Sequence, residues 1–201
     1  MVGIILNREM KMSNLVRIAG LDPSLSNFGI SEGTLNIETN EVTITNFFLV
    51  ETEASKNKKQ VRVNSDDLRR AAEIWQVLMP VVLRSQIIFA ELPVGSQSSR
   101  AQTSYGICLG LLAAISKPMI QLTPTDIKLH AGNKKDTSKA EIIEWAVSKQ
   151  PNAPWLKKKV KGVESLVGKN EHLADSVVAI YAGIETDQYK QAVNMMRSFI
   201  S

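Results

Sequence analysis

The sequence contains few cysteine, histidine and aromatic residues. Its single cysteine, Cys108, excludes an internal disulfide, and the apolar stretch at 101–115 around it disfavours a catalytic thiol. A reducing compartment such as the cytoplasm is the simplest location for a chain of this kind. Aromatic residues make up 5% of the chain, which argues against an extended platform on which single-stranded bases would stack.

Long apolar runs are also missing. No stretch approaches the length of a membrane span, and the N-terminal run from Val2 to Leu6 is too short for a signal sequence. We therefore expect no membrane association. Residues 1–14 precede the first expected strand and are expected to form an N-terminal arm or extension. Residues 15–201 are expected to form one domain, because a chain with 44% hydrophobic residues can bury one sizeable core.

Two apolar stretches each end in a carboxylate followed by a proline. The first, VRIAGLDPS at 16–24, lacks the helical period, and Pro23 cannot donate a hydrogen bond within a sheet, so we expect the strand to stop at Asp22. The second, SQIIFAELP at 85–93, ends in the same way at Glu91. One strand-end acid is usually a turn or cap residue, but two acids at equivalent strand ends can meet in one site.

A third group of polar residues lies on an expected helix from Val163 to Ile184, whose apolar residues recur at helical spacing. Glu171, His172 and Asp175 fall near its beginning, and their spacings of three and four residues place them on one face. In the simpler interpretation, the two acids complement the helix dipole. Together with the two strand-end acids, a divalent-metal cluster is favoured, because close carboxylates repel one another unless a cation neutralises them.

These segments resemble the RuvC-type Holliday-junction resolvases, which are nucleases of the ribonuclease H-like, retroviral integrase superfamily. The resemblance is carried by IAGLDPSLSNFGIS around Asp22, by IIFAELPVGSQSSRAQTSYGICLGLL around Glu91, and by EHLADSVVAIYAG on the expected helix. The three segments occur in the family's order and spacing, and together they extend over nearly the whole chain. Two positions depart from the family pattern: Ser24 stands where the family usually has glycine, and Val94 where it often has an aromatic residue.

The resemblance implies an α/β fold with a ribonuclease H-like mixed five-stranded sheet flanked by helices. It also implies two Mg²⁺ or Mn²⁺ ions per active site and a homodimer that nicks four-way DNA junctions symmetrically. Asp22, Glu91, His172 and Asp175 would then be both catalytic residues and metal ligands, with Glu171 as a reserve candidate.

Local patterns predict the other elements. Strands are expected at about 15–22, 27–35, 42–50, 86–91 and 118–122. Helices are expected after the cap residues 64–67, with a disturbance at Pro80, and at about 97–116, 137–149, 163–184 and 188–200. A turn at 123–126 and a basic loop at 150–165 lie between them.

The net charge is +4, and many of the basic residues gather in three clusters. The clusters are Lys56, Lys58, Lys59 and Arg62; Lys134, Lys135 and Lys139; and Lys157, Lys158, Lys159 and Lys161. Each alone is more often a solvated surface, but three clusters in a chain with an acidic site suit phosphate binding. We expect DNA contacts from the second cluster, from Lys157, Lys158 and Lys159, and from Arg100. His130 is expected to be structural or to lie on the surface.

Together with the acidic and basic clusters, the resemblance implies a metal-dependent, structure-specific endodeoxyribonuclease that hydrolyses phosphodiesters of Holliday junctions or other branched DNA. Two alternatives stay open: a catalytically inactive module that binds branched DNA, and an actin-like ATPase fragment. Gly106 and Gly110 permit close packing of the helix at 97–116, either on the sheet or across the interface of a homodimer. Both a cellular and a viral source are compatible with the sequence.

Overall fold

The computed structural model describes residues 14–57, 62–160 and 162–198. The expected N-terminal arm, apart from Asn14, lies outside the described residues, as do Lys58, Lys59 and Lys161 of the basic clusters. Among the described helices, none is both long enough and apolar enough to cross a membrane.

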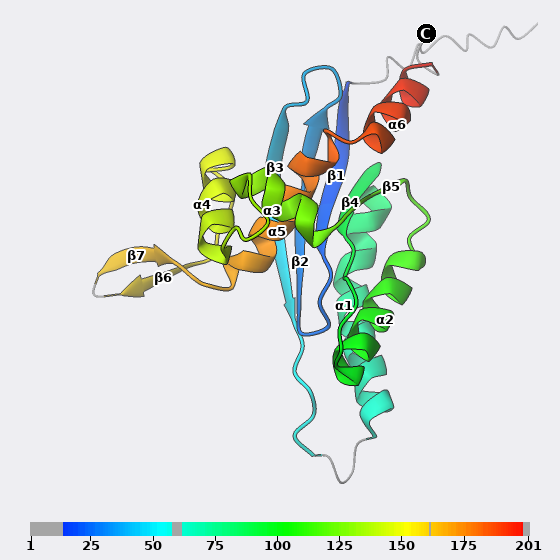
Figure 1. The fold of residues 1–201 in the computed structure, drawn as a ribbon, viewed down its shortest axis with the longest axis vertical. Coiled ribbons are helices and arrows are strands. Elements are labelled where there is room, and N and C mark those ends of the chain that lie inside the picture. The colour runs from blue at the N-terminus through cyan, green and yellow to red at the C-terminus, as the bar shows by residue number, and fades with distance from the viewer. Residues whose placement is uncertain (1–13, 58–61, 161, 199–201) are drawn as a thin grey trace, which may run out of the picture.

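A mixed sheet of five strands forms the centre of the fold (Figure 1). In the order β3-β2-β1-β4-β5, its strands are β3 (Val42–Glu51), β2 (Asn27–Asn36), β1 (Leu15–Asp22), β4 (Ile87–Glu91) and β5 (Met119–Leu122). The first three strands along the chain pair antiparallel, whereas β4 runs parallel to both β1 and β5. The α/β class and the five expected strands are confirmed, and each observed strand end lies within one residue of the expected end.

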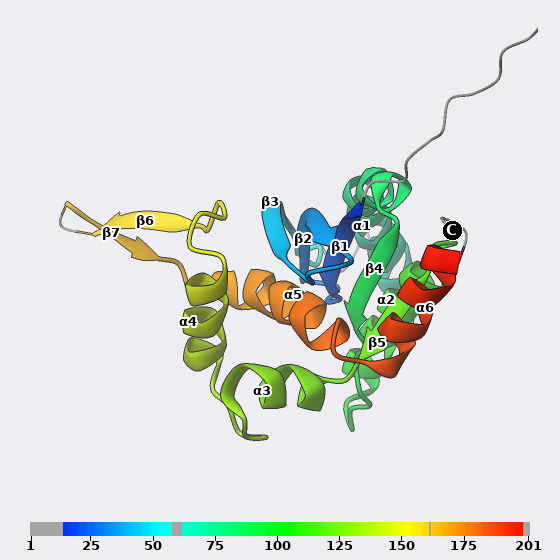
Figure 2. The same cartoon turned by 90° about the horizontal axis from the view of Figure 1, so that it is seen from above.

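Helices cover both faces of this sheet (Figure 2). On one face lie α1 (Val63–Arg84) and α2 (Ser99–Ala113), and α5 (Asn170–Gly183) crosses the other face. Two further helices, α3 (Pro124–Gly132) and α4 (Lys139–Lys149), contact α5, and α6 (Asp187–Ser198) follows it along the chain. This sheet flanked by helices is the arrangement that the resemblance implied, and the structure confirms it.

Alternation along the central strands determines which side chains face which helices. In β1, Ile18 lies in the core beneath α5, whereas Ala19 and Leu21 lie in the core beneath α1 and α2. In β4, Phe89 lies on the α5 side. Each large buried side chain contributes roughly 1.5–3 kcal/mol, and a shift of one residue would exchange the two faces. The register of these strands is therefore strongly specified, and so is the direction of the residues at their ends.

The prediction of one helix from Val163 to Ile184 is wrong, and so is that of a loop at 150–165. Residues Lys157–Val160 form β6 and Val163–Leu166 form β7, which pair antiparallel as a separate two-stranded sheet. Gly162, at φ 84°, supplies a left-handed conformation directly before β7. The helix α5 begins only at Asn170. The expected helix was too long because the apolar residues of β7 fall at helical spacing in the sequence without belonging to the helix.

Three smaller expectations about helices also fail. α1 continues through Pro80, which is exposed, so that water can satisfy the carbonyl that loses its N–H partner. The expected cap residues 64–67 lie inside α1, and its N-cap is Arg62. The expected turn at 123–126 begins the helix α3, since Thr123 and Asp126 form a capping box around Pro124.

Candidate metal centre

Two parallel strands bring Asp22 and Glu91 to the same edge of the sheet. Leu21 pairs with Ala90 in the parallel register, and each acid is the next residue of its strand. Asp22 alternates with Ile18 and Glu91 with Phe89, so both carboxylates are directed toward the face that α5 covers. The sequence patterns that ended each strand in an acid therefore position both acids beneath one helix.

The helix α5 supplies the third acid and approaches the strands closely. A side chain on Gly20 would place its Cβ 2.0 Å from the Ser176 carbonyl oxygen, and one on Gly29 would place its Cβ 2.2 Å from the carbonyl oxygen of His172. Only glycine fits at these two positions while the helix keeps its place. Because Gly20 and Gly29 have no side chains, the first turns of α5, which carry His172 and Asp175, can lie against the strand ends.

Three carboxylates converge at this point. Asp22, Glu91 and Asp175 each offer an oxygen, and these atoms lie within 4.8 Å of one another. They line a pocket of about 360 Å³, to which Tyr105 from α2 and Lys139 from α4 also contribute. The structure thus brings together three of the four predicted ligands in a partly enclosed site.

The fourth predicted residue, His172, lies beside this cluster and contacts Asp22. Its Nδ1 atom is 2.7 Å from Asp22 Oδ2, and its Nε2 atom is 3.4 Å from a carboxylate oxygen of Glu171. Glu171 in turn accepts a hydrogen bond of 3.0 Å from the Lys139 ammonium group. These contacts form a chain from Lys139 through Glu171 and His172 to Asp22, in which His172 orients the carboxylate that it touches.

Burial raises the pKa of all three clustered carboxyl groups. The pKa of Glu91 rises to about 9 and that of Asp175 to about 7, mainly through burial and secondly through the negative charge of Asp22. Burial also raises the pKa of Asp22, and this effect outweighs the hydrogen bond and the charge of His172, which lower it. Full ionisation of the cluster therefore costs free energy, because the charges are both desolvated and mutually repulsive.

The donor set fits a divalent cation. Three oxygen ligands from carboxylates suit Mg²⁺ and Mn²⁺, and a cation placed between them would offset both the repulsion and the desolvation of their charges. His172 holds Asp22 through Nδ1, which is the kind of outer contact that orients a metal ligand. Asp22, Glu91 and Asp175 are thus the residues that would hold metal, and a direct ligand role for His172 stays a prediction.

The predicted DNA-contacting residues are distributed unevenly around the site. Lys139 lies at the pocket itself, while Lys134 forms an ion pair of 2.8 Å with Glu141 at the start of α4. Arg100 forms an ion pair with the buried Asp67, with a closest approach of 2.5 Å. Lys157, Lys158 and Lys159 lie on β6, away from the pocket.

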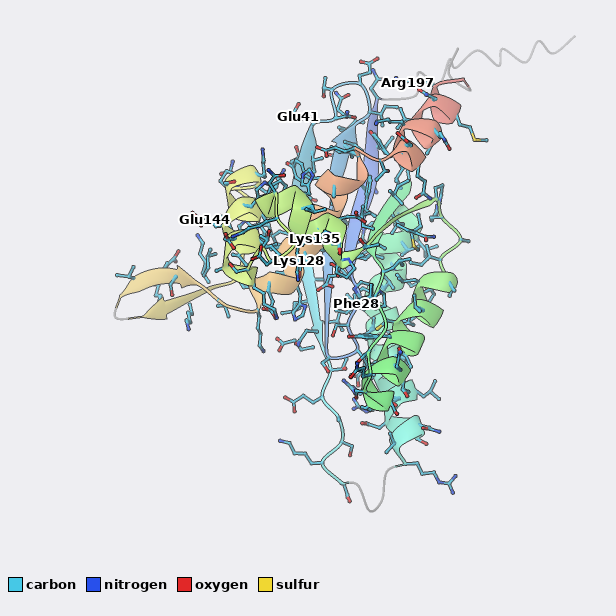
Figure 3. The ribbon with its side chains drawn as sticks, viewed as in Figure 1. Phe28, Glu41, Lys128, Lys135, Glu144 and Arg197 are labelled. Atoms are coloured by element: carbon cyan, nitrogen blue, oxygen red, sulfur yellow. The ribbon has the colours of Figure 1, made fainter. Side chains whose placement is uncertain are left out.

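Sequence reasoning missed Lys128 and Tyr105, which also border the cluster. Lys128 lines a smaller adjoining pocket with Glu91 and Asp175, and its positive charge lowers the pKa of Glu91. In Figure 3, Lys128 and Lys135 lie with α3 on the face turned toward the viewer. The capping signal at 123–126 would have revealed α3, and with it the place of Lys128.

The two remaining sequence-based expectations concern Cys108 and His130. Cys108 is buried, and burial raises the pKa of its thiol to about 12, which agrees with a structural role. His130 Nδ1 lies 3.3 Å from Glu185, and its ring packs edge-on against Trp145. Neither residue contributes to the carboxylate cluster.

A scan against protein-family models and a search of curated proteins found no match. Among solved structures, the fold is similar to that of RuvC from Thermus thermophilus in two structures, one of which is in complex with a Holliday junction substrate. Both comparisons give a TM-score of 0.56 at 16% identity and cover 96% of the RuvC chain, with 84% and 88% of this chain. The fowlpox virus Holliday junction resolvase also matches, with a TM-score of 0.48 at 12% identity over 84% of this chain and 98% of that chain. The match to RuvC confirms the expected ribonuclease H-like fold.

Proposed function

We propose that this protein is a metal-dependent, structure-specific endodeoxyribonuclease that cuts Holliday junctions or related branched DNA. The convergence of Asp22, Glu91 and Asp175 from three separate elements carries this proposal. Several buried carboxylates at one point serve the hydrolysis of phosphodiesters by bound divalent cations. The similarity to RuvC, which was solved with a Holliday junction substrate, supports branched DNA as the ligand class.

In this proposal the three acids hold the metal. Asp22, at the end of the central strand, would together with Glu91 and Asp175 hold two Mg²⁺ or Mn²⁺ ions. When bound, such ions supply an activated water and stabilise the charge on the leaving oxygen. His172 holds the Asp22 carboxylate in place through Nδ1, and the carboxylate of Glu171 lies 3.4 Å from the second ring nitrogen of His172, Nε2. Lys139 and Lys128 place positive charge beside the acids, where the phosphate backbone would enter.

Nicking of a synthetic four-way junction tests this function directly. With Mg²⁺ or Mn²⁺ present we expect paired nicks in the junction and little cutting of a linear duplex of the same sequence. Chelation with EDTA should stop the reaction. Binding without cutting at any divalent-ion concentration would instead support the inactive DNA-binding module, and a nucleotide-binding titration would reveal the ATPase alternative.

A further inference from the structure

The β6–β7 hairpin is a part of the chain that the metal centre does not use. Its strands, Lys157–Val160 and Val163–Leu166, pair only with each other within the described part of the chain. Both views show the hairpin extending away from the central sheet beyond α4 (Figures 1 and 2). A two-stranded ribbon is marginally stable by itself, so contact with a partner would add to its stability.

The exposed surface of the hairpin is positively charged. Three successive lysines lie on β6, and the Nζ atom of Lys157 is 3.5 Å from the carboxylate of Glu164 on β7. No ion pair neutralises Lys158 or Lys159 among the residues that the structure describes. Because side chains alternate along a strand, these two lysines are directed to opposite faces of the ribbon. The hairpin therefore offers free positive charge on both faces.

The base of the hairpin is fixed to the helix that carries the site. Asn170, the first residue of α5, is fully buried and holds the main chain of Leu156 with two hydrogen bonds, of 3.0 and 2.8 Å. One residue before Leu156, the buried Trp155 packs against Phe47 with a ring separation of 4.6 Å. His172 follows Asn170 by two positions, so the base of the hairpin is joined to the first turn of the helix that carries His172 and Asp175.

We propose that the β6–β7 hairpin is an arm that binds the duplex DNA leading into the metal centre. A two-stranded ribbon fits the major groove of DNA, which is roughly 12 Å wide, and lysines on its strands would pair with the flanking phosphates. The same lysines disfavour edge-to-edge pairing with a second protein chain. This inference rests on the proposed function, because it takes DNA as the ligand.

Charge reversal on the ribbon tests the arm. Lys158→Glu with Lys159→Glu is introduced into the Asp22→Asn protein, so that DNA is bound without being cut. We expect weaker binding to both linear duplex and four-way junction, and a salt dependence of log affinity that is flatter by about 1.8, or about 0.9 for each lost phosphate contact. Lys190→Glu on α6, a lysine 60% exposed at the other end of the molecule, is the control for a charge reversal away from the hairpin. A double variant that behaves like this control would overturn the inference.

A tethered chemical probe locates the arm on DNA. Since Cys108 is buried, Val163→Cys, at a position 69% exposed on β7, would provide the reactive thiol for an iron chelate that cleaves nearby DNA. We expect cleavage confined to one position on each duplex arm that a hairpin contacts, and none above background from Lys190→Cys. Equal cleavage from both positions would contradict the inference. The probe reports binding alone. If the protein binds DNA through the hairpin but never nicks junctions, the proposed function is refuted, whereas the inference that the hairpin binds DNA is retained.

Discussion

Asp22 and His172 are separated by 150 residues in the chain, yet Asp22 Oδ2 and His172 Nδ1 lie 2.7 Å apart. The contact joins the end of β1 to the first turn of α5, and the small surface of Gly29, beside Asp22 in the sheet, permits it. Burial lowers the pKa of His172, but its hydrogen bond to Asp22 and the surrounding acids raise it by more. His172 therefore serves as a partner that orients Asp22.

If His172 orients a metal ligand, its replacement should weaken metal binding. We expect His172→Ala to lower the apparent affinity for Mn²⁺ by about 10- to 100-fold, the range typical of such outer contacts. His172→Asn should recover part of this loss because an amide N–H can still donate to Asp22. Calorimetric titration of Mn²⁺ measures both variants, and an unchanged affinity in His172→Ala would assign the residue a different role.

Asp22 itself should be indispensable for cutting but not for binding. Asp22→Asn keeps the shape of the side chain and removes the ligand charge, so nicking should fall by at least roughly 10³-fold, since the bound ions supply several kcal/mol. Junction binding should persist or improve slightly as repulsion of the phosphates decreases. Asp187→Asn, at a side chain 90% exposed on α6, is the control. Near-normal nicking by Asp22→Asn would refute the site.

The metal-free protein should lose stability as the pH rises. The pKa of Glu91, about 9, and that of Asp175, about 7, are raised in the folded state, so the folded protein binds more protons than the unfolded chain between their usual and their raised values. The free energy of unfolding then decreases between about pH 5 and pH 9. Calorimetry in EDTA should show Tm falling over this range, and saturating Mg²⁺ should flatten the decline. Glu91→Gln should also reduce it, whereas the exposed Glu38→Gln should not; equal slopes would contradict the assigned burial effect.

The strands and their acids could be predicted because the signal is local. Alternation and a terminal Pro23 place Asp22, and the same pattern places Glu91, without knowledge of the rest of the chain. The hairpin could not be predicted in this way, since its apolar residues Val163 and Leu166 fall at the spacing of the helix that follows. Its existence depends on the turn at Gly162 and on the buried anchor at its base, which are properties of the folded chain.

Two lysines of the second basic cluster should differ in their contribution to DNA binding. Both lysines are ion-paired, Lys139 with Glu171 and Lys134 with Glu141, but only Lys139, which is 73% exposed, is among the residues that line the carboxylate pocket. We expect Lys139→Ala to flatten the salt dependence of log affinity by up to roughly 0.9, and Lys134→Ala to change it little. Fluorescence anisotropy over a series of salt concentrations measures this. Identical slopes for the two variants and the unmodified protein would show that Lys139 is a solvated surface residue that does not contact DNA.

The helix α2 should form the interface of a two-fold dimer, because a four-way junction presents two equivalent strands and one self-complementary surface pairs two sites. The structure shows that Gly106 and Gly110 do not pack against the sheet, since a Cβ at either position would meet nothing within 4 Å. Gly110→Arg can therefore fold as a monomer, and we expect it to separate the dimer while leaving Tm nearly unchanged. Lys190→Ala on α6 is the control. Sedimentation of the unmodified protein decides the matter: a monomer at micromolar concentration, with and without junction DNA, would exclude coordinated cutting and favour a nuclease that makes single nicks.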